Sequence, residues 1–342
     1  MELEAKFEKK VFKFKRPSGT SRGVLTEKLA WFIYVWDKSN PEVIGIGECS
    51  VISGLSPDFK NSSAYENKVS EVIENINHFR KRIDLLENYP SIYFGLEMAL
   101  LDLNNGGKRI YFDTSFTNGT QKLPINGLVW MGDISFMKSQ IEEKINQGFE
   151  CIKLKIGALD FNSELALLEN IRKNFDKDQI TLRVDANGAF RPEEALKKLY
   201  DLSNFDIHSI EQPIEPNHHE EMFELCQKSP IPIALDEELI NITEEESKEK
   251  LLNSIKPQYI ILKPSLIGGF KGTLEWIKYA DRANIKWWIT SALESNIGLD
   301  AISQFTSTFD IELPQGLGTG SLYENNIPSK LYIVGGNIYR KV

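Results

Sequence analysis

A structural unit that recurs along residues 119–316 constrains the fold more than any other feature of the sequence. Each copy has a short apolar stretch, a polar residue, a loop and an amphipathic stretch, which predicts a strand followed by a helix. The predicted strands end near Asn126, Lys155, Asp185, Glu211, Asp236, Lys263, Ser291 and Gly316. Neighbouring ends are 29, 30, 26, 25, 27, 28 and 25 residues apart, the length of one βα unit in a parallel barrel. We therefore predict an α/β barrel with (β/α)7β topology, similar to a TIM barrel.

An open, doubly wound sheet is the alternative fold for strands and helices that alternate in this way. Such sheets bind dinucleotides through a Gly-x-Gly-x-x-Gly turn that opens a helix after the first strand. No turn of this kind follows any of the predicted strands. The barrel is therefore the favoured interpretation.

Residues 1–118 are predicted to form a separate α+β capping domain. Apolar and other residues alternate from Leu29 to Val35, which indicates a strand, and residues 37–41 carry a turn signal. We expect an antiparallel meander there. The segments 16–23 and 53–57 are polar or rich in Gly, Ser and Pro, and they are predicted to be loops that carry specificity.

Two helices and a C-terminal hairpin complete the predicted organisation. Apolar residues at helical spacing predict helices over residues 64–87 and 92–104, and a change of composition after residue 106 marks the end of the capping domain. In the C-terminal segment 317–342, two glycines and an asparagine between apolar stretches predict a hairpin that returns to the capping domain.

The bulk composition excludes several classes of protein. The 342 residues carry a formal charge of −9 and no basic stretch interleaved with aromatic residues, so nucleic acid is not an expected partner. The first residues lack the apolar region of a signal peptide, and no stretch is long and apolar enough to predict a membrane span. Three widely spaced cysteines suit reduced thiols. We expect a cytoplasmic protein that acts on a small molecule; the sequence leaves homo-oligomerisation open.

Five charged residues stand at consecutive predicted strand ends. In chain order they are Lys155, Asp185, Glu211, Asp236 and Lys263. The active site of a closed barrel lies at the carboxyl ends of its strands, so these side chains are expected to converge. A single Asp or Lys at a strand end is more often a cap or a surface ion pair. Five such residues in register indicate a functional site.

Three converging carboxylates repel one another unless a cation lies between them. Oxygen ligands without nearby His or Cys favour a hard ion, so Asp185, Glu211 and Asp236 are predicted to bind Mg²⁺, with Mn²⁺ as a possible substitute. A lysine beside another ammonium group and a divalent ion is expected to have a pKa lowered from about 10.4 toward roughly 7–8, which suits a general base.

This arrangement predicts the removal of a proton next to a carboxylate. The product is an enolate dianion, and a metal ion bound to the same carboxylate stabilises the charge as it develops. The expected substrate is therefore a small-molecule carboxylate. A barrel protein that binds ligands without catalysis is the alternative of another class, and the presence of all five charged residues argues against it.

These motifs resemble the enolase superfamily, specifically its muconate-lactonising subgroup. The resemblance rests on Gly45-Ile-Gly-Glu48 in the first domain and on the barrel motifs Lys153-Leu-Lys155, Asp185-Ala-Asn187, Glu211-Gln-Pro213 and Lys263-Pro264. It implies that the first domain is a lid over the barrel mouth. Because the subgroup includes racemases, lactonising enzymes and a dehydratase, membership fixes the proton abstraction but not the product.

Within this subgroup the chain is most similar to the dehydratases of menaquinone biosynthesis. The similarity rests on residues 126–132, 291–298 and 316–319. It implies that Lys155 removes the proton and returns it to the departing hydroxyl, while Lys263 stabilises the enolate from the opposite face.

The barrel motifs and strand ends suggest some of the residues that bind the substrate, and the polar loop over residues 16–23 suggests Arg22 and Ser18. The predicted substrate-binding residues are Lys153, Asn187, Ser291, Ser295, Trp130, Arg22 and Ser18.

A dipeptide epimerase is the leading rival, and a racemase of N-acylated amino acids is a further alternative. In the epimerases, an Asp-x-Asp motif near the eighth strand holds the substrate amine. Asp310 and Glu312 match that motif poorly and are predicted to precede the strand end.

Overall fold

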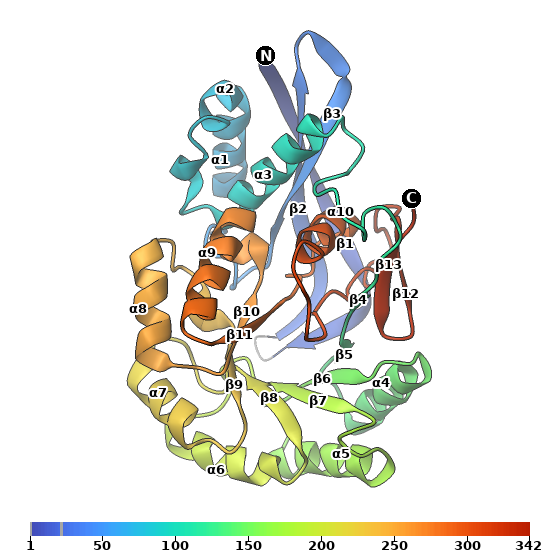
Figure 1. The fold of residues 1–342 in the computed structure, drawn as a ribbon, viewed down its shortest axis with the longest axis vertical. Coiled ribbons are helices and arrows are strands. Elements are labelled where there is room, and N and C mark those ends of the chain that lie inside the picture. The colour runs from blue at the N-terminus through green and yellow to red at the C-terminus, as the bar shows by residue number, and fades with distance from the viewer. Residues whose placement is uncertain (1, 21–22) are drawn as a thin grey trace.

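A computed structural model describes residues 2–20 and 23–342 of the chain and shows a capping domain above a barrel (Figure 1). The capping domain comprises β1 (Leu3–Thr20), β2 (Gly23–Asp37), β3 (Asn40–Val51), α1 (Ser62–Glu74), α2 (Ile76–Phe79), the 3-10 helix η1 (Ile83–Leu86) and α3 (Pro90–Asn104). Its three strands pair antiparallel in the order β1-β2-β3, which confirms the predicted meander.

The predicted loop over residues 16–23 is largely strand in the structure. β1 continues to Thr20, with Ser18 opposite Leu25, after an irregularity in the register between Lys13 and Ser18. This irregularity accommodates the Pro-containing stretch, so that pairing with β2 resumes beyond it. Near its tip, the hairpin forms an antiparallel bridge from Gly19 to Met131 of the barrel.

The predicted helix over residues 64–87 is broken into α1, α2 and η1. The break lies at Asn75, whose backbone (φ −113°, ψ 31°) is not helical and whose side chain donates a hydrogen bond to Glu71 O at 2.9 Å. Asparagine favours such local bonds over a continuous helix. The helix predicted over residues 92–104 is confirmed as α3.

Strand β3 packs directly on helix α3 because glycines line their contact. A Cβ atom at Gly47 would lie only 1.7 Å from Gly95 O, and one at Gly45 would lie 2.0 Å from Ala99 O. No larger residue fits at either position without moving the backbone. The two glycines of the Gly-Ile-Gly-Glu motif therefore set the distance between the sheet and helix α3.

The barrel is built from alternating parallel strands and helices, as predicted. Its elements are β5 (Gly127–Val129), α4 (Ile134–Asn146), β6 (Cys151–Lys155), α5 (Phe161–Asn174), β7 (Thr181–Asp185), α6 (Pro192–Ser203), β8 (Ile207–Glu211), α7 (His219–Lys228), β9 (Ile233–Leu235), η2 (Glu237–Leu239), α8 (Glu245–Ile255), β10 (Tyr259–Leu262), η3 (Pro264–Leu266), α9 (Gly269–Arg282), β11 (Lys286–Ile289) and α10 (Asn296–Thr306). The short strand β4 (Leu123–Pro124) precedes them and belongs to another sheet. Strands β5 to β11 form one sheet in sequence order.

A two-residue stretch closes the barrel between β11 and the first barrel strand. Gln315 bridges to Ile125 and Gly316 bridges to Thr290, both in parallel orientation. Backbone bonds of 3.0 Å from Asn126 N to Gln315 O and 2.9 Å from Gly316 N to Ile289 O complete the closure. This confirms the predicted eighth strand position at Gly316.

The observed strand ends agree with the predictions at Lys155, Asp185 and Glu211, while Asp236 and Lys263 directly follow β9 and β10. The first strand is the exception. It was predicted to end near residue 126, but β5 continues to residue 129, because pairing with β6 extends to Val129.

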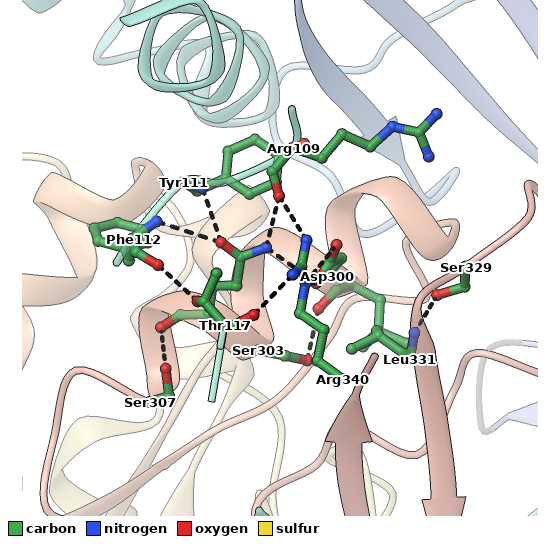
Figure 2. Close-up of polar contacts among 12 residues, drawn as sticks. Arg109, Tyr111, Phe112, Thr117, Asp300, Ser303, Ser307, Ser329, Leu331 and Arg340 are labelled. Carbon is green, nitrogen blue, oxygen red and sulfur yellow. Dashed lines mark hydrogen bonds and ion pairs between the residues drawn. The ribbon is translucent and has the colours of Figure 1, made fainter. Parts of the chain in front are cut away.

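The C-terminal hairpin consists of β12 (Leu331–Val334) and β13 (Asn337–Arg340). It pairs with β4 at the start of the barrel, whereas the preceding segment meets the capping domain through a bridge from Tyr323 to Phe14. The buried Arg340 donates hydrogen bonds of 3.0 Å to Asp300 and to the carbonyls of Thr117 and Arg109 (Figure 2). These contacts tie the C-terminus to α10 and to the linker between the domains.

No helix in residues 2–20 and 23–342 has the length and apolar character needed to cross a membrane. The three cysteines are buried and unbridged, as predicted.

Candidate active site

A cavity opens at the carboxyl ends of the barrel strands, beneath the capping domain. Its lining residues are Leu25, Ile52, Ser53, Leu55, Asn126, Leu128, Trp130, Lys153, Lys155, Asn187, Lys263, Thr290, Ser291, Ala292, Leu293, Gly316, Gly318 and Thr319. The capping domain supplies the first four, so the predicted loop over residues 53–57 faces the cavity.

The strand register brings the five predicted charged residues together. Lys155, Asp185 and Glu211 are direct neighbours on β6, β7 and β8. Because side chains alternate along a strand, Lys153 points to the same side as Lys155. Asp236 follows β9 and is 2% exposed, while Lys263 follows β10 and lines the cavity.

Each carboxylate of the site is paired with lysine. Asp185 Oδ2 lies 2.6 Å from Lys155 Nζ and 3.1 Å from Lys153 Nζ. Lys153 Nζ also donates to Glu211 Oε2 at 2.7 Å. Lys263 Nζ donates to Asp236 Oδ2 and lies 3.8 Å from Glu211 Oε1. Three ammonium groups therefore balance three buried carboxylates.

The surroundings separate the pKa values of the acids. Burial raises the pKa of Glu211 to about 8, with repulsion from Asp185 as the next cause. Burial also acts to raise the pKa of Asp185, but Lys155 and the other two lysines outweigh it and hold that pKa well below its usual range. The surroundings thus favour the ionised form of Asp185 and the protonated form of Glu211.

Neighbouring carboxylates determine the pKa of Lys263 when only protein groups surround it. Burial acts to lower the pKa of Lys263, but the attraction of Asp236 and Glu211 is stronger and raises it. The predicted lowering of a lysine pKa includes a divalent ion beside the lysine, so it stays a prediction for the metal-bound site.

The donor set suits a hard divalent cation. All three acids present oxygen, and the buried Glu211 Oε1 accepts no hydrogen bond from the described residues. In residues 2–20 and 23–342, no three His, Cys, Asp or Glu side chains are already grouped tightly enough to hold a metal ion. Lys153 lies between Asp185 and Glu211, so the acids can gather around a cation when this ammonium group withdraws.

Comparison with known proteins shows the family to which the chain belongs. The model for enolase C-terminal domain-like proteins matches residues 137–338. An o-succinylbenzoate synthase from Desulfotalea psychrophila is 44% identical over 98% of both chains. The crystal structure of MenC from this organism superposes with a TM-score of 0.87 at 41% identity, covering 98% of this chain and 99% of that one. The chain belongs to the o-succinylbenzoate synthase family of the enolase superfamily.

The same fold also serves other reactions in this superfamily. The structure of the L-Ala-D/L-Glu epimerase from Bacillus subtilis superposes with a TM-score of 0.84, covering 100% of this chain and 97% of that one. Its identity to this chain is 18%, so the likeness concerns the fold alone. Enzymes of the superfamily depend on a metal ion, which agrees with the oxygen-rich site of this synthase family member.

Four of the predicted substrate-binding residues line the cavity of this o-succinylbenzoate synthase family member: Lys153, Asn187, Ser291 and Trp130. Asn187 Oδ1 accepts a hydrogen bond of 2.7 Å from Lys155, and its Nδ2 donates to Glu237 at 3.0 Å. Asn187 therefore fixes the position of the predicted base.

Two further predicted residues, Ser18 and Ser295, do not line this cavity. Ser18 lines a neighbouring cavity that shares Trp130 with the first one. Ser295 is buried at the start of α10, where its hydroxyl donates to Glu48 Oε2 at 2.6 Å, so the prediction that it binds substrate is corrected. Arg22 lies outside the described residues.

Sequence reasoning missed several residues of the cavity. Asn126 and Thr290 are buried, and the side-chain oxygen of each has no hydrogen-bond partner in the described part of the chain. Their polar character at strand ends was a weak signal. The apolar Leu25 and Leu55 gave none, because apolar residues in a capping domain are equally expected in its core.

Proposed function

We propose that this protein catalyses the Mg²⁺-dependent dehydration of 2-succinyl-6-hydroxy-2,4-cyclohexadiene-1-carboxylate to o-succinylbenzoate, a step of menaquinone biosynthesis in the cytoplasm. The observation that carries this proposal is the 44% identity to an o-succinylbenzoate synthase over 98% of the chain. The paired lysines and acids at the barrel mouth supply the chemistry that such a dehydration needs.

Lys155 is the proposed acid and base. Its ammonium nitrogen lies 2.6 Å from Asp185 Oδ2 and 2.7 Å from Asn187 Oδ1, and the residue lines the cavity. As the neutral amine it takes the proton from the ring carbon that bears the carboxylate. The electron pair then moves into the ring as the bond to the hydroxyl breaks. The proton returns from Lys155 to this hydroxyl, which leaves as water, and the ring becomes aromatic.

Asp185, Glu211 and Asp236 are the proposed ligands of Mg²⁺, for which Mn²⁺ can substitute. When bound, the ion stabilises the negative charge that develops on the substrate carboxylate as the adjacent proton leaves. Lys263 lines the cavity from β10, on the other side of the acids from Lys155, and stabilises the same charge. Lys153 moves from between two acids toward the substrate carboxylate.

An amino acid racemase or dipeptide epimerase fits the cavity less well. Asp310 and Glu312, the poor match to the amine-binding motif of the epimerases, line a different cavity together with Lys286, at the start of β11. Glu312 is paired there with Lys286 Nζ at 3.1 Å. Neither Asp310 nor Glu312 lines the active-site cavity, so the two carboxylates that match this motif are not placed to hold a substrate amine there.

A paired assay distinguishes these reactions. We expect the purified protein with Mg²⁺ to produce the ultraviolet absorbance of o-succinylbenzoate from the cyclohexadiene substrate. Solvent deuterium should enter N-acylated amino acids or dipeptides much more slowly. Efficient exchange into either amino acid substrate without dehydration would reject the proposal in favour of a racemase or epimerase.

A further inference from the structure

One wall of the active-site cavity is the segment Ser291–Ser295, which links β11 to α10. Ser291, Ala292 and Leu293 all line the cavity. The segment belongs to the barrel, but two of its hydrogen-bond partners lie on the capping sheet, more than 240 positions away in the chain. This wall is the place where the two domains build the cavity together.

The backbone of this wall is strained. Leu293 has a φ of +61°, in the left-handed region that residues with a Cβ atom rarely adopt. Such a conformation persists only where the surroundings hold it in place. Contacts with other parts of the chain must therefore hold Leu293 in this conformation.

Hydrogen bonds with three other parts of the chain hold Ala292, Leu293 and Ser295 of the wall. Lys28 Nζ, on β2, donates to Ala292 O. The hydroxyl of Tyr323 donates to Leu293 O at 2.6 Å. The backbone N–H of Ser295 donates to Glu48 Oε1 at 2.8 Å, and its hydroxyl donates to Glu48 Oε2. The strained residue is thus held on both sides.

Glu48 also acts as a cap for helix α10. Its Oε2 accepts the backbone N–H of Gly298 at 2.8 Å, in the first turn, where N–H groups lack partners within the helix. A Cβ atom at position 298 would lie 3.0 Å from this oxygen and 2.7 Å from Glu294 Cβ, so glycine permits the approach. The packing of β3 on α3 fixes Glu48 from the other side.

Lys28 is buried among acidic groups of both domains. It is 5% exposed, and Glu48 and Glu294 attract its ammonium group. Glu294 is itself fixed by the hydroxyl of Ser265, which donates to its Oε1 at 2.5 Å. Lys28 donates a hydrogen bond to a backbone carbonyl of the other domain. This bond fixes the position of the carbonyl, whatever it adds to the stability of the fold.

We propose that Lys28 and Glu48 are positioning residues that hold the wall Ser291–Ser295 in its strained, cavity-lining conformation, so that the pocket is complete only when the capping sheet is docked. Neither side chain lines the cavity. They act through Ala292 and Ser295. The effect on turnover rests on the proposed function, whereas the effect on the conformation of the wall does not.

The first test compares Lys28→Met with Lys248→Met. Lys248 is a matched control because it is also buried and paired with an acid, Glu275, but contacts no residue of the wall. For Lys28→Met we expect kcat/KM to fall about tenfold, mainly through KM, and hydrogen exchange in residues 292–298 to rise about tenfold. Lys248→Met should leave both within about twofold of wild type. Equal effects of the two variants would overturn the proposal.

If Lys28→Met does not fold, Glu48→Gln serves as the second variant. Glutamine keeps the volume of the side chain but offers one acceptor oxygen in place of two, so the same changes should follow at smaller size. Unchanged exchange in residues 292–298 of this variant would count against the proposal.

A second test uses the strain itself. Leu293→Gly and Leu293→Ala both remove the side chain from the wall, but only glycine adopts a positive φ without cost. With Lys28 present, the two variants should have similar kcat/KM. In the Lys28→Met background, the glycine variant should exceed the alanine variant by about tenfold. The same ratio in both backgrounds would show that Lys28 does not hold the strained conformation.

The two tests separate failure of this inference from failure of the proposed function. If the wild-type protein does not dehydrate the cyclohexadiene substrate, hydrogen exchange still reports whether Lys28 and Glu48 hold the wall. If dehydration occurs but exchange in the wall does not respond to Lys28→Met, the positioning role alone is rejected.

Discussion

The barrel side of the active-site cavity is charged, whereas the capping side is apolar. On the barrel side, Lys153, Lys155 and Lys263 face a layer of three buried acids. On the capping side, Leu25, Ile52 and Leu55 cover the opening. The barrel groups can move protons and hold a cation, while the described capping residues, apolar except for Ser53, exclude water and shape the space.

Separate parts of the chain therefore supply the chemistry and the shape of the pocket. The charged groups need only the strand register of the barrel, because neighbouring strands align them. The shape depends on contacts between domains, through Lys28, Glu48 and the wall after β11. Changes on the barrel side should therefore remove turnover, and changes on the capping side should alter stability and substrate affinity.

Lys155→Ala should give the largest effect and tests the barrel side. General acid–base groups contribute about 10²–10⁴-fold, and we expect kcat to fall by about 10³-fold or more. Metal binding should stay close to wild type because Lys155 is not one of the proposed ligands, and thermal unfolding should stay close because Lys153 still pairs with Asp185 in the metal-free protein. Substantial remaining dehydratase activity would remove Lys155 from its proposed role.

Gly47→Ala tests the capping side. The added methyl group would lie 1.7 Å from Gly95 O, so β3 and α3 must separate. We expect the free energy of unfolding to fall by about 3 kcal/mol, measured by denaturant titration, with a rise in KM because Glu48 shifts. A lowered kcat at unchanged stability would contradict the assignment of turnover to the barrel side alone. Gly335→Ala is a suitable control, since a Cβ atom there meets no heavy atom within 4 Å, although its positive φ adds a small cost.

Glu97→Gln tests the junction between the domains at pH values near neutral. Glu97, on α3, accepts the backbone N–H of Phe270 at the start of α9 at 2.6 Å. Burial raises its pKa from 4.5 to about 7. The folded protein therefore holds this proton more tightly than the unfolded chain, and the contribution of Glu97 to stability is lost as the pH rises from about 4.5 to about 7.

The variant should lose this part of the pH dependence. Between pH 5 and 7.5, we expect the stability of the wild-type protein to fall relative to Glu97→Gln by on the order of 1 kcal/mol, measured by chemical denaturation at each pH. Parallel profiles for the two proteins would show that Glu97 titrates normally.

The barrel and its charged residues could be predicted because their signals are local. Lys155, Asp185 and Glu211 each end an apolar stretch, and the regular spacing of these stretches identifies the edge of the barrel where they meet. Alternation along a strand likewise placed Lys153 beside Lys155. Their roles in catalysis and metal binding stay predictions until the variants are measured.

The contacts between distant parts of the chain could not be predicted in the same way. Ser295 belongs to the segment 291–298, which suggested substrate binding, but its partner Glu48 lies 247 residues earlier. Residues 16–20 looked like a loop because their composition is typical of turns, yet pairing with β2 makes them strand. The raised pKa of Lys263 depends on how closely two acids approach it, which spacing along the chain does not give.

Asp185, Glu211 and Asp236 are proposed to hold one divalent cation next to Lys155. Electron paramagnetic resonance of Mn²⁺ added to the purified protein tests it most directly. We predict one bound Mn²⁺ per chain, with a Kd that rises by at least about tenfold in Glu211→Gln and stays similar in Lys155→Ala. Absence of bound Mn²⁺, or an equal Kd in wild type and Glu211→Gln, would contradict the proposed cation site.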